Sequence, residues 1–154
     1  MQGRTYRFFE GTPLYPFGHG LSYTTFKYAN LRASAPTLAA GGTVTVRVDV
    51  TNTGARAGDE VVQLYARHLG SKVDRPRKDL RGYQRVSLRP GETRTVSFAL
   101  PARSLAYWDA AADRWVVESG PIELQAGASS EDVRQRTTIR TAGGAAGPRV
   151  TKER

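Results

Sequence analysis

Cysteine is absent from the 154-residue chain. Its absence excludes a disulfide scaffold, a thiolate metal site and a cysteine nucleophile, but export stays open because an oxidising compartment permits disulfides without requiring them. No run approaches the roughly 18 to 20 apolar residues of a membrane span. The first residues, 1–7, contain no apolar signal-peptide core, so the localisation stays open, with secretion or a periplasmic location among the options.

Histidine and paired carboxylates are also scarce. His19 and His68 lie far apart and lack metal-motif spacing, so neither a metal nor another cofactor is expected. A glycosidase needs two carboxyl groups that face one sugar. The acidic doublets at 59–60 and 131–132 are sequence neighbours, which point to opposite faces of a strand. The sequence therefore predicts no catalytic residue within this chain.

Basic residues, in contrast, are abundant. Lys and Arg number 23 against 14 Asp and Glu, a formal net charge of +9. Nine of the basic residues form a band between positions 67 and 94: Arg67, Lys72, Arg75, Arg77, Lys78, Arg81, Arg85, Arg89 and Arg94. The band is typical of a solvated face or a contact with an acidic partner, and it also suits weak attraction to acidic polysaccharide. Specific binding of nucleic acid is not expected, because aromatic residues do not alternate with the arginines.

The first 26 residues combine aromatic rings with glycine and proline. Glycine and proline interrupt the segment so often that neither a helical nor a strand period can be recognised. Six of these rings, left in water, would form an unusually large apolar patch: Phe8, Phe9, Tyr15, Phe17, Tyr23 and Phe26. The sequence predicts an extended lead-in over residues 1–26 that needs a surface to lie on.

Short strands follow the lead-in. Val44, Val46, Val48 and Val50 alternate with polar residues, which is the strongest strand signal in the chain. Further strands are expected near 58–66, 80–88, 93–100, 122–126 and 133–139, with a hairpin around 109–114. These features predict an all-β protein, an antiparallel immunoglobulin or fibronectin type III-like β-sandwich of seven or eight strands over residues 27–141. A flexible tail is expected over 142–154.

Three aromatic residues, Tyr83, Trp108 and Trp115, are candidates for binding a polymer by ring stacking. Packing in the core or at a sheet edge explains the tryptophan hairpin equally well. Two tryptophans in one short hairpin need not share a face, so at least one is expected to pack inward.

Six motifs in order carry a family likeness. They are Tyr15-Pro-Phe-Gly-His-Gly-Leu-Ser-Tyr-Thr24, Val50-Thr-Asn-Thr-Gly54, Gly58-Asp-Glu-Val-Val-Gln-Leu-Tyr65, Arg75-Pro-Arg-Lys-Asp-Leu-Arg-Gly-Tyr83, Leu88-Arg-Pro-Gly-Glu92 and Trp115-Val-Val-Glu-Ser-Gly120. Together they resemble the C-terminal fibronectin type III-like domain of family 3 glycoside hydrolases, the β-glucosidases and β-xylosidases. The likeness covers about residues 3–141.

The resemblance implies a non-catalytic accessory domain. In complete members of the family the catalytic Asp and Glu lie in domains that precede this one, so no catalytic residue is carried over, and the implied partners are those catalytic domains. Six residues are candidates for the domain interface: Tyr15, Phe17, His19, Tyr23, Arg75 and Lys78. The alternative is a module that tethers a parent enzyme to cellulose, xylan, lignin or an acidic polysaccharide.

Overall fold

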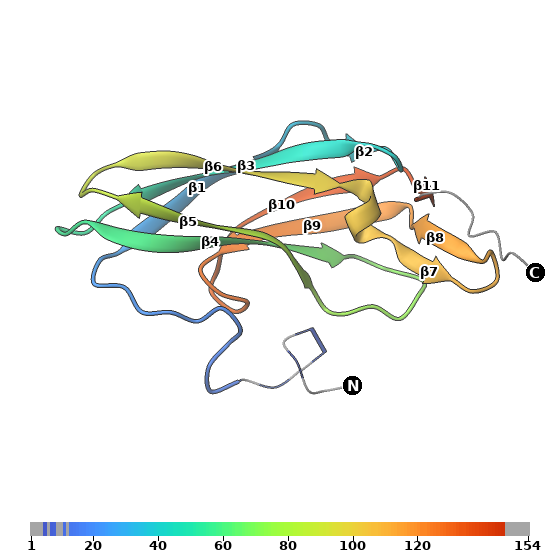
Figure 1. The fold of residues 1–154 in the computed structure, drawn as a ribbon, viewed down its shortest axis with the longest axis horizontal. Helices are drawn as coiled ribbons and strands as arrows, with labels where there is room; N and C mark the ends of the chain where they lie inside the picture. Colours follow the sequence, from blue (N-terminus) through green and yellow to red (C-terminus); the bar gives the residue numbers. More distant parts are fainter. Residues whose placement is uncertain (1–4, 6, 9–10, 12, 147–154) are drawn as a thin grey trace, which may run out of the picture.

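The protein is described by a computed structural model that covers residues 5, 7–8, 11 and 13–146, and its regular structure is almost entirely β (Figure 1). The strands are β1 (Phe26–Ala33), β2 (Thr37–Leu38), β3 (Thr43–Asn52), β4 (Gly58–His68), β5 (Asp79–Leu88), β6 (Thr93–Pro101), β7 (Tyr107–Asp109), β8 (Arg114–Val117), β9 (Gly120–Gly127), β10 (Val133–Thr141) and β11 (Gly144–Ala145). A short 3-10 helix, η1 (Ala102–Leu105), joins β6 to β7.

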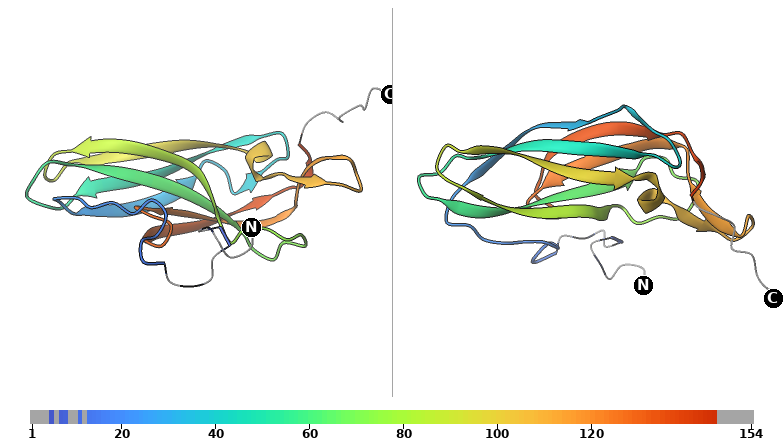
Figure 2. Two further views of the ribbon diagram at one scale, coloured as in Figure 1. Left: turned by 60° about the horizontal axis from the view of Figure 1, so that its bottom comes forward. Right: turned by 45° about the horizontal axis from the view of Figure 1, so that its top comes forward.

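Two sheets form the layers of a sandwich. One has the strand order β1-β3-β6 and the other the order β2-β10-β9-β4-β5. All pairings within them are antiparallel except that of β2 with β10, which is parallel. Figure 2 shows the two layers from further sides. The predicted fibronectin type III-like sandwich is confirmed, and the structure adds a small third sheet, β11-β8-β7, at one end.

The alternation in β3 produces the core. Val44, Val46, Val48 and Val50 are at most 3% exposed, whereas the residues between them are half-buried or exposed. Removing one such side chain from water contributes roughly 1.5–3 kcal/mol. The valines belong to one cluster with the inward residues of the facing sheet, which explains why this strand was recognisable from sequence.

The C-terminal residues differ from the predicted flexible tail. Gly144 and Ala145 form β11 and pair with Val117 and Val116 of β8. The N–H of Ala146 also donates to the carbonyl of Trp115. A two-residue strand of small side chains has no apolar period, so the sequence carried no signal for it. Residues 147–154 lie outside the described residues.

A buried amide closes one end of the sandwich. The Asn52 side chain donates to the carbonyls of Arg56 (2.8 Å) and Leu88 (2.9 Å), and its Oδ1 accepts from Gly54 N (3.0 Å) and Thr24 Oγ1 (2.8 Å). Its backbone also exchanges two hydrogen bonds with the turn between β5 and β6. The motifs at 50–54 and 88–92 are therefore joined to each other, because Asn52 in the first motif forms hydrogen bonds with residues of the second.

Glycines make room for the side chain that reaches Asn52 from the lead-in. A Cβ atom on Gly58 would lie 2.6 Å from Cγ2 of Thr24, and one on Gly54 would meet Oγ1 of the same residue. A larger side chain at either position would push Thr24 away from the amide. Glycine is therefore needed at positions 54 and 58, because the side chain of Thr24 lies too close to the backbone there for a larger residue.

Asn52→Ala is expected to destabilise the domain by about 3 kcal/mol, because it removes four hydrogen bonds and takes the amide donor away from the buried carbonyl of Leu88. Urea unfolding followed by tryptophan fluorescence measures the loss. Gln84→Ala, at an exposed position of β5, is the control and is expected to change the free energy of unfolding by less than about 0.5 kcal/mol. A similar midpoint for both variants would contradict the assigned role.

Candidate docking surface

The lead-in is fastened to the sandwich by its backbone. The Gln63 side chain, on the outer face of β4, donates to the carbonyls of Gly18 (3.2 Å) and Ala128 (2.6 Å). The N–H of Ser130, between β9 and β10, donates to the carbonyl of Phe17 (2.8 Å). Figure 2 shows the lead-in running along this side of the five-stranded sheet. The surface that the sequence required is therefore partly supplied by the sandwich itself.

Gly18 sets the direction of the lead-in. Its φ is +80°, and a Cβ atom there would lie 2.6 Å from Nε2 of Gln63. His19 N–H donates to the carbonyl of Pro16 (3.0 Å), so the chain turns at this point. Only glycine combines this backbone conformation with the close approach to the amide.

Several aromatic side chains of the lead-in are exposed to solvent, whereas Phe26 at its end is buried in the core of the sandwich. Tyr15, Phe17 and Tyr23 are 73%, 47% and 95% exposed, and His19 is exposed with its ring 5.7 Å from that of Tyr15. Two exposed leucines, Leu14 and Leu21, share this surface and were missed by the sequence analysis. The surface formed by residues 14–23 is called the lead-in face below.

Two hollows flank the lead-in face. One, of about 1160 Å³, lies between residues 21–23 and the turn that joins β5 to β6. The other, of about 780 Å³, lies between residues 18–22 and the start of β1 and is also lined by Glu60 and Arg134. Burial raises the pKa of Glu60.

A polar layer lies beneath the lead-in. The Tyr65 hydroxyl donates to Oε1 of Gln63 (2.5 Å). Lys78 donates to the carbonyl of Ser130, and its Nζ lies 3.5 Å from Glu131 and 5.7 Å from the ring centre of Tyr65. Tyr65 and Gln63, on the outer face of β4, and Lys78, directly before β5, are at most 8% exposed. The lead-in and the loop between β9 and β10 exclude water from them.

Arg75 also turns inward. Its Nε lies 3.3 Å from Glu118, its Nη1 donates to the carbonyl of Leu105 (3.2 Å), and its guanidinium lies 4.9 Å from the ring centre of Tyr107. The motif that begins at Arg75 thus fastens the segment between β4 and β5 to its own domain at two points, Arg75 and Lys78. A direct contact of these two residues with another domain stays a prediction.

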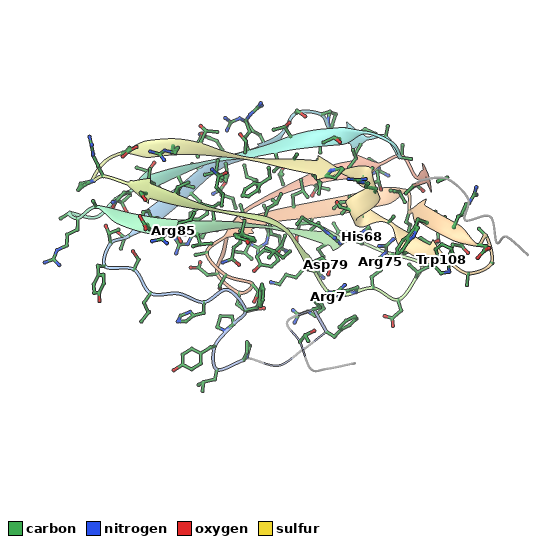
Figure 3. The ribbon with its side chains drawn as sticks, in the orientation of Figure 1. Arg7, His68, Arg75, Asp79, Arg85 and Trp108 are labelled. Carbon is green, nitrogen blue, oxygen red and sulfur yellow. The ribbon has the colours of Figure 1, made fainter. Side chains whose placement is uncertain are left out.

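The lead-in has a second attachment nearer its start. Arg7 Nε lies 2.5 Å from Oδ1 of Asp79, and Arg77 N–H donates to the carbonyl of Arg7 (2.7 Å). Figure 3 shows Arg7 and Asp79 pointing toward one another below β5. The chain therefore reaches the sandwich beside the segment that carries Arg75.

The basic band does not form a uniform patch. Five of its nine members pair with carboxylates spread over several elements: Arg75 with Glu118, Lys78 with Glu131, Arg81 with Asp79, Arg85 with Asp59, and Arg94 with Glu92. Exposed pairs contribute little stability. Local neutralisation of these charges weakens the case for a general polyanion surface.

Tyr83 lies apart from the two tryptophans. It is 71% exposed on β5, directly opposite Gln63, and so belongs to the region of the lead-in. Trp108 and Trp115 lie on the β7–β8 hairpin, where they are direct cross-strand partners and are 40% and 51% exposed. The expectation that one tryptophan packs inward is wrong, because direct partners project from the same face of a hairpin.

The described part of the chain contains neither a cluster of metal-ligating side chains nor a membrane-spanning helix. Residues 5, 7–8, 11 and 13–146 contain no group of three or more His, Cys, Asp or Glu side chains placed to hold a metal ion. Within the same residues, no helix has the length and apolar character needed to cross a bilayer.

His68 lies at the end of β4 near Arg75 and Glu118. Burial, reinforced by the positive charge of Arg75, lowers the pKa of His68 to about 4. As the pH falls, His68 is protonated near pH 6.5 in the unfolded chain but only near pH 4 in the folded chain. Stability from neutral His68 is therefore complete above pH 6.5 and is lost as the pH falls toward 4.

We expect this loss to be about 1–2 kcal/mol between pH 7 and 4, given the partial exposure of the ring. His68→Gln, which cannot titrate, is expected to flatten this part of the curve of unfolding free energy against pH. Gln84→Ala, at an exposed position of β5 that carries no titratable group, is the control and leaves the shape of the curve unchanged. Parallel curves for the wild type and His68→Gln would disprove the assignment.

Substitution at Gly18 tests how the lead-in is held. Gly18→Ala introduces strain at positive φ and a clash with Gln63, so hydrogen exchange in residues 13–25 is expected to speed up at least tenfold, with a loss of about 1–2 kcal/mol in stability. Gly20→Ala is the matched control, because a Cβ there meets nothing within 4 Å. Equal exchange in both variants would rule out the proposed anchor.

Comparison with known proteins matches residues 60–130 to the fibronectin type III-like domain family. A β-xylosidase from Formosa agariphila is 50% identical over 126 residues, covering 82% of this chain and 17% of the enzyme. The thermostable β-glucosidase B of Acetivibrio thermocellus is 41% identical over 138 residues, covering 88% of this chain and 18% of the enzyme.

Solved structures agree. β-Glucosidase 3B from Thermotoga neapolitana, in complex with α-D-glucose, superposes with a TM-score of 0.82 at 37% identity, covering 93% of this chain and 19% of that one. The chain thus spans about a fifth of the length of these relatives. It belongs to the fibronectin type III-like domains of family 3 β-glucosidases and β-xylosidases and corresponds to that part of the enzymes, not to their catalytic part.

Proposed function

We propose that the chain is a non-catalytic structural domain that docks onto, and stabilises, the catalytic part of a β-glucosidase or β-xylosidase. The lead-in face carries this proposal. Its backbone is fixed to the sandwich through Gln63 and Ser130, while its aromatic and leucine side chains face solvent. Contiguous exposed apolar surface of this kind marks an interaction site.

The fixed backbone suits docking. A segment that is already ordered before it binds loses less conformational freedom on association, so more of the contact energy remains as affinity. Gly18, Gln63 and Ser130 provide this order from three separate chain regions. The partner is the remainder of an enzyme of the kind found in the relatives, in which about four fifths of the chain lies outside the matched part.

Polymer tethering is the second candidate function, and one observation favours it. Trp108 and Trp115 are both exposed, as ring-stacking residues must be. Tyr83, however, lies opposite Gln63 on β5 and does not join them in one platform. Docking therefore has the stronger support.

A graft tests the proposed function. The matched segment of the Formosa agariphila β-xylosidase is deleted, or replaced by this chain, and both proteins are compared with the intact enzyme. We expect the deletion to lower the temperature of half-inactivation on an aryl β-xyloside by several degrees and the graft to restore most of it. The isolated chain is expected to hydrolyse neither aryl β-xylosides nor aryl β-glucosides.

The lead-in face is then altered within the graft. Replacing Tyr15 and Leu21 with serine removes exposed apolar contacts without touching Gln63 or Ser130, and we expect it to reverse much of the restoration. A deletion as stable as the intact enzyme, or a graft no better than the deletion, would refute the docking role.

A further inference from the structure

The tryptophan hairpin presents an open corner. The ring centres of Trp108 and Trp115 are 5.8 Å apart and the rings are inclined at 72°, an edge-to-face arrangement. In such a pair the edge of one ring points at the face of the other, so the two ring planes do not form one flat surface. A flat polysaccharide chain stacks on coplanar faces, whereas the corner suits an apolar side chain that projects from a protein surface.

The hairpin is held rigidly from both sides. Arg75 packs on the ring of Tyr107 and binds the carbonyl of Leu105, while β11 pairs along β8. At the tip, Oδ1 of Asp109 accepts hydrogen bonds from the N–H groups of residues 111 and 112, at 3.0 and 3.1 Å. Tryptophans fixed in this way are typical of the few residues that dominate the energy of a protein interface.

The hairpin lies near the point where the lead-in is attached to the sandwich through Arg7. Arg7 binds Asp79 and Arg77, and Arg75 in the same connection between β4 and β5 contacts Tyr107, the neighbour of Trp108. Figure 3 shows Arg7, Asp79, Arg75 and Trp108 in succession along this part of the molecule.

We propose that Trp108 and Trp115 form a second docking point for the same catalytic part that the lead-in face contacts. The inference rests on the proposed function. Its occupant is an apolar side chain on the surface of the catalytic part, which is brought near by the attachment of the chain at Arg7. Two separate contacts, linked through the segment 71–79, fix the rotation of the domain against its partner.

The graft on the Formosa agariphila β-xylosidase provides the test. Trp108→Ala with Trp115→Ala is expected to cancel at least half of the restored thermal resistance. In the isolated chain the same double variant, which has no tryptophan left and is therefore followed by circular dichroism, keeps the midpoint of urea unfolding within about 10% of the wild type, because both rings are half exposed. Arg47→Ala, exposed on β3 of the opposite sheet, is the matched control and is expected to leave the restoration intact.

Hydroxyl-radical oxidation read by mass spectrometry gives an independent measurement. Trp108 and Trp115 are expected to be oxidised at least threefold more slowly in the graft than in the isolated chain. Equal oxidation, with the double variant restoring stability as well as the wild type does, would overturn the second docking point and leave the proposed function standing. Failure of the unsubstituted graft would instead remove the proposed function itself.

Binding to a polysaccharide is the competing outcome. The isolated chain is incubated with insoluble cellulose or xylan at low and high salt, alongside the double tryptophan variant. Retention that survives high salt and disappears in the variant would overturn the proposal in favour of polymer tethering. Absence of retention, together with protection of both tryptophans in the graft, is the result that supports it.

Discussion

The side chain of Asn52 uses all four of its hydrogen-bonding positions, and the closure of the sandwich depends on them. It ties the end of β3 to the end of β5, to the segment before β4 and to Thr24 of the lead-in. The Gln63 amide repeats this solution farther along, because it joins β4 to Gly18 and Ala128. Two buried amides therefore connect the lead-in to the fold before any partner is present.

The strands were predictable because their information is local. A period of two in β3 follows directly from one buried and one exposed face, and turn residues mark the ends of most strands. The path of the lead-in and the inward course of Arg75 and Lys78 were not predictable. Their partners, Glu118 for Arg75 and Ser130 for Lys78, lie 43 and 52 residues away, and sequence patterning does not report such contacts.

The candidate docking surface was predicted in part. The number of rings in the lead-in indicated an apolar surface, and Tyr15, Phe17 and Tyr23 lie on it. The leucines at 14 and 21 were missed because neither belongs to a recognisable apolar pattern in the sequence. The shared face of the tryptophans could have been found. In the hairpin, Asp109 pairs with Arg114. The next residues away from the turn on the two strands, Trp108 and Trp115, are therefore also directly opposite each other.

A polar layer beneath the lead-in has a physical advantage over an apolar one. Apolar contacts tolerate a slip along the chain, whereas the carbonyls of Phe17 and Gly18 meet Ser130 and Gln63 in a single register. An out-of-register lead-in would leave a buried amide without its partner, which is costly. The hydrogen bonds thus determine which side chains face outward, and with them the surface that the proposed docking would use.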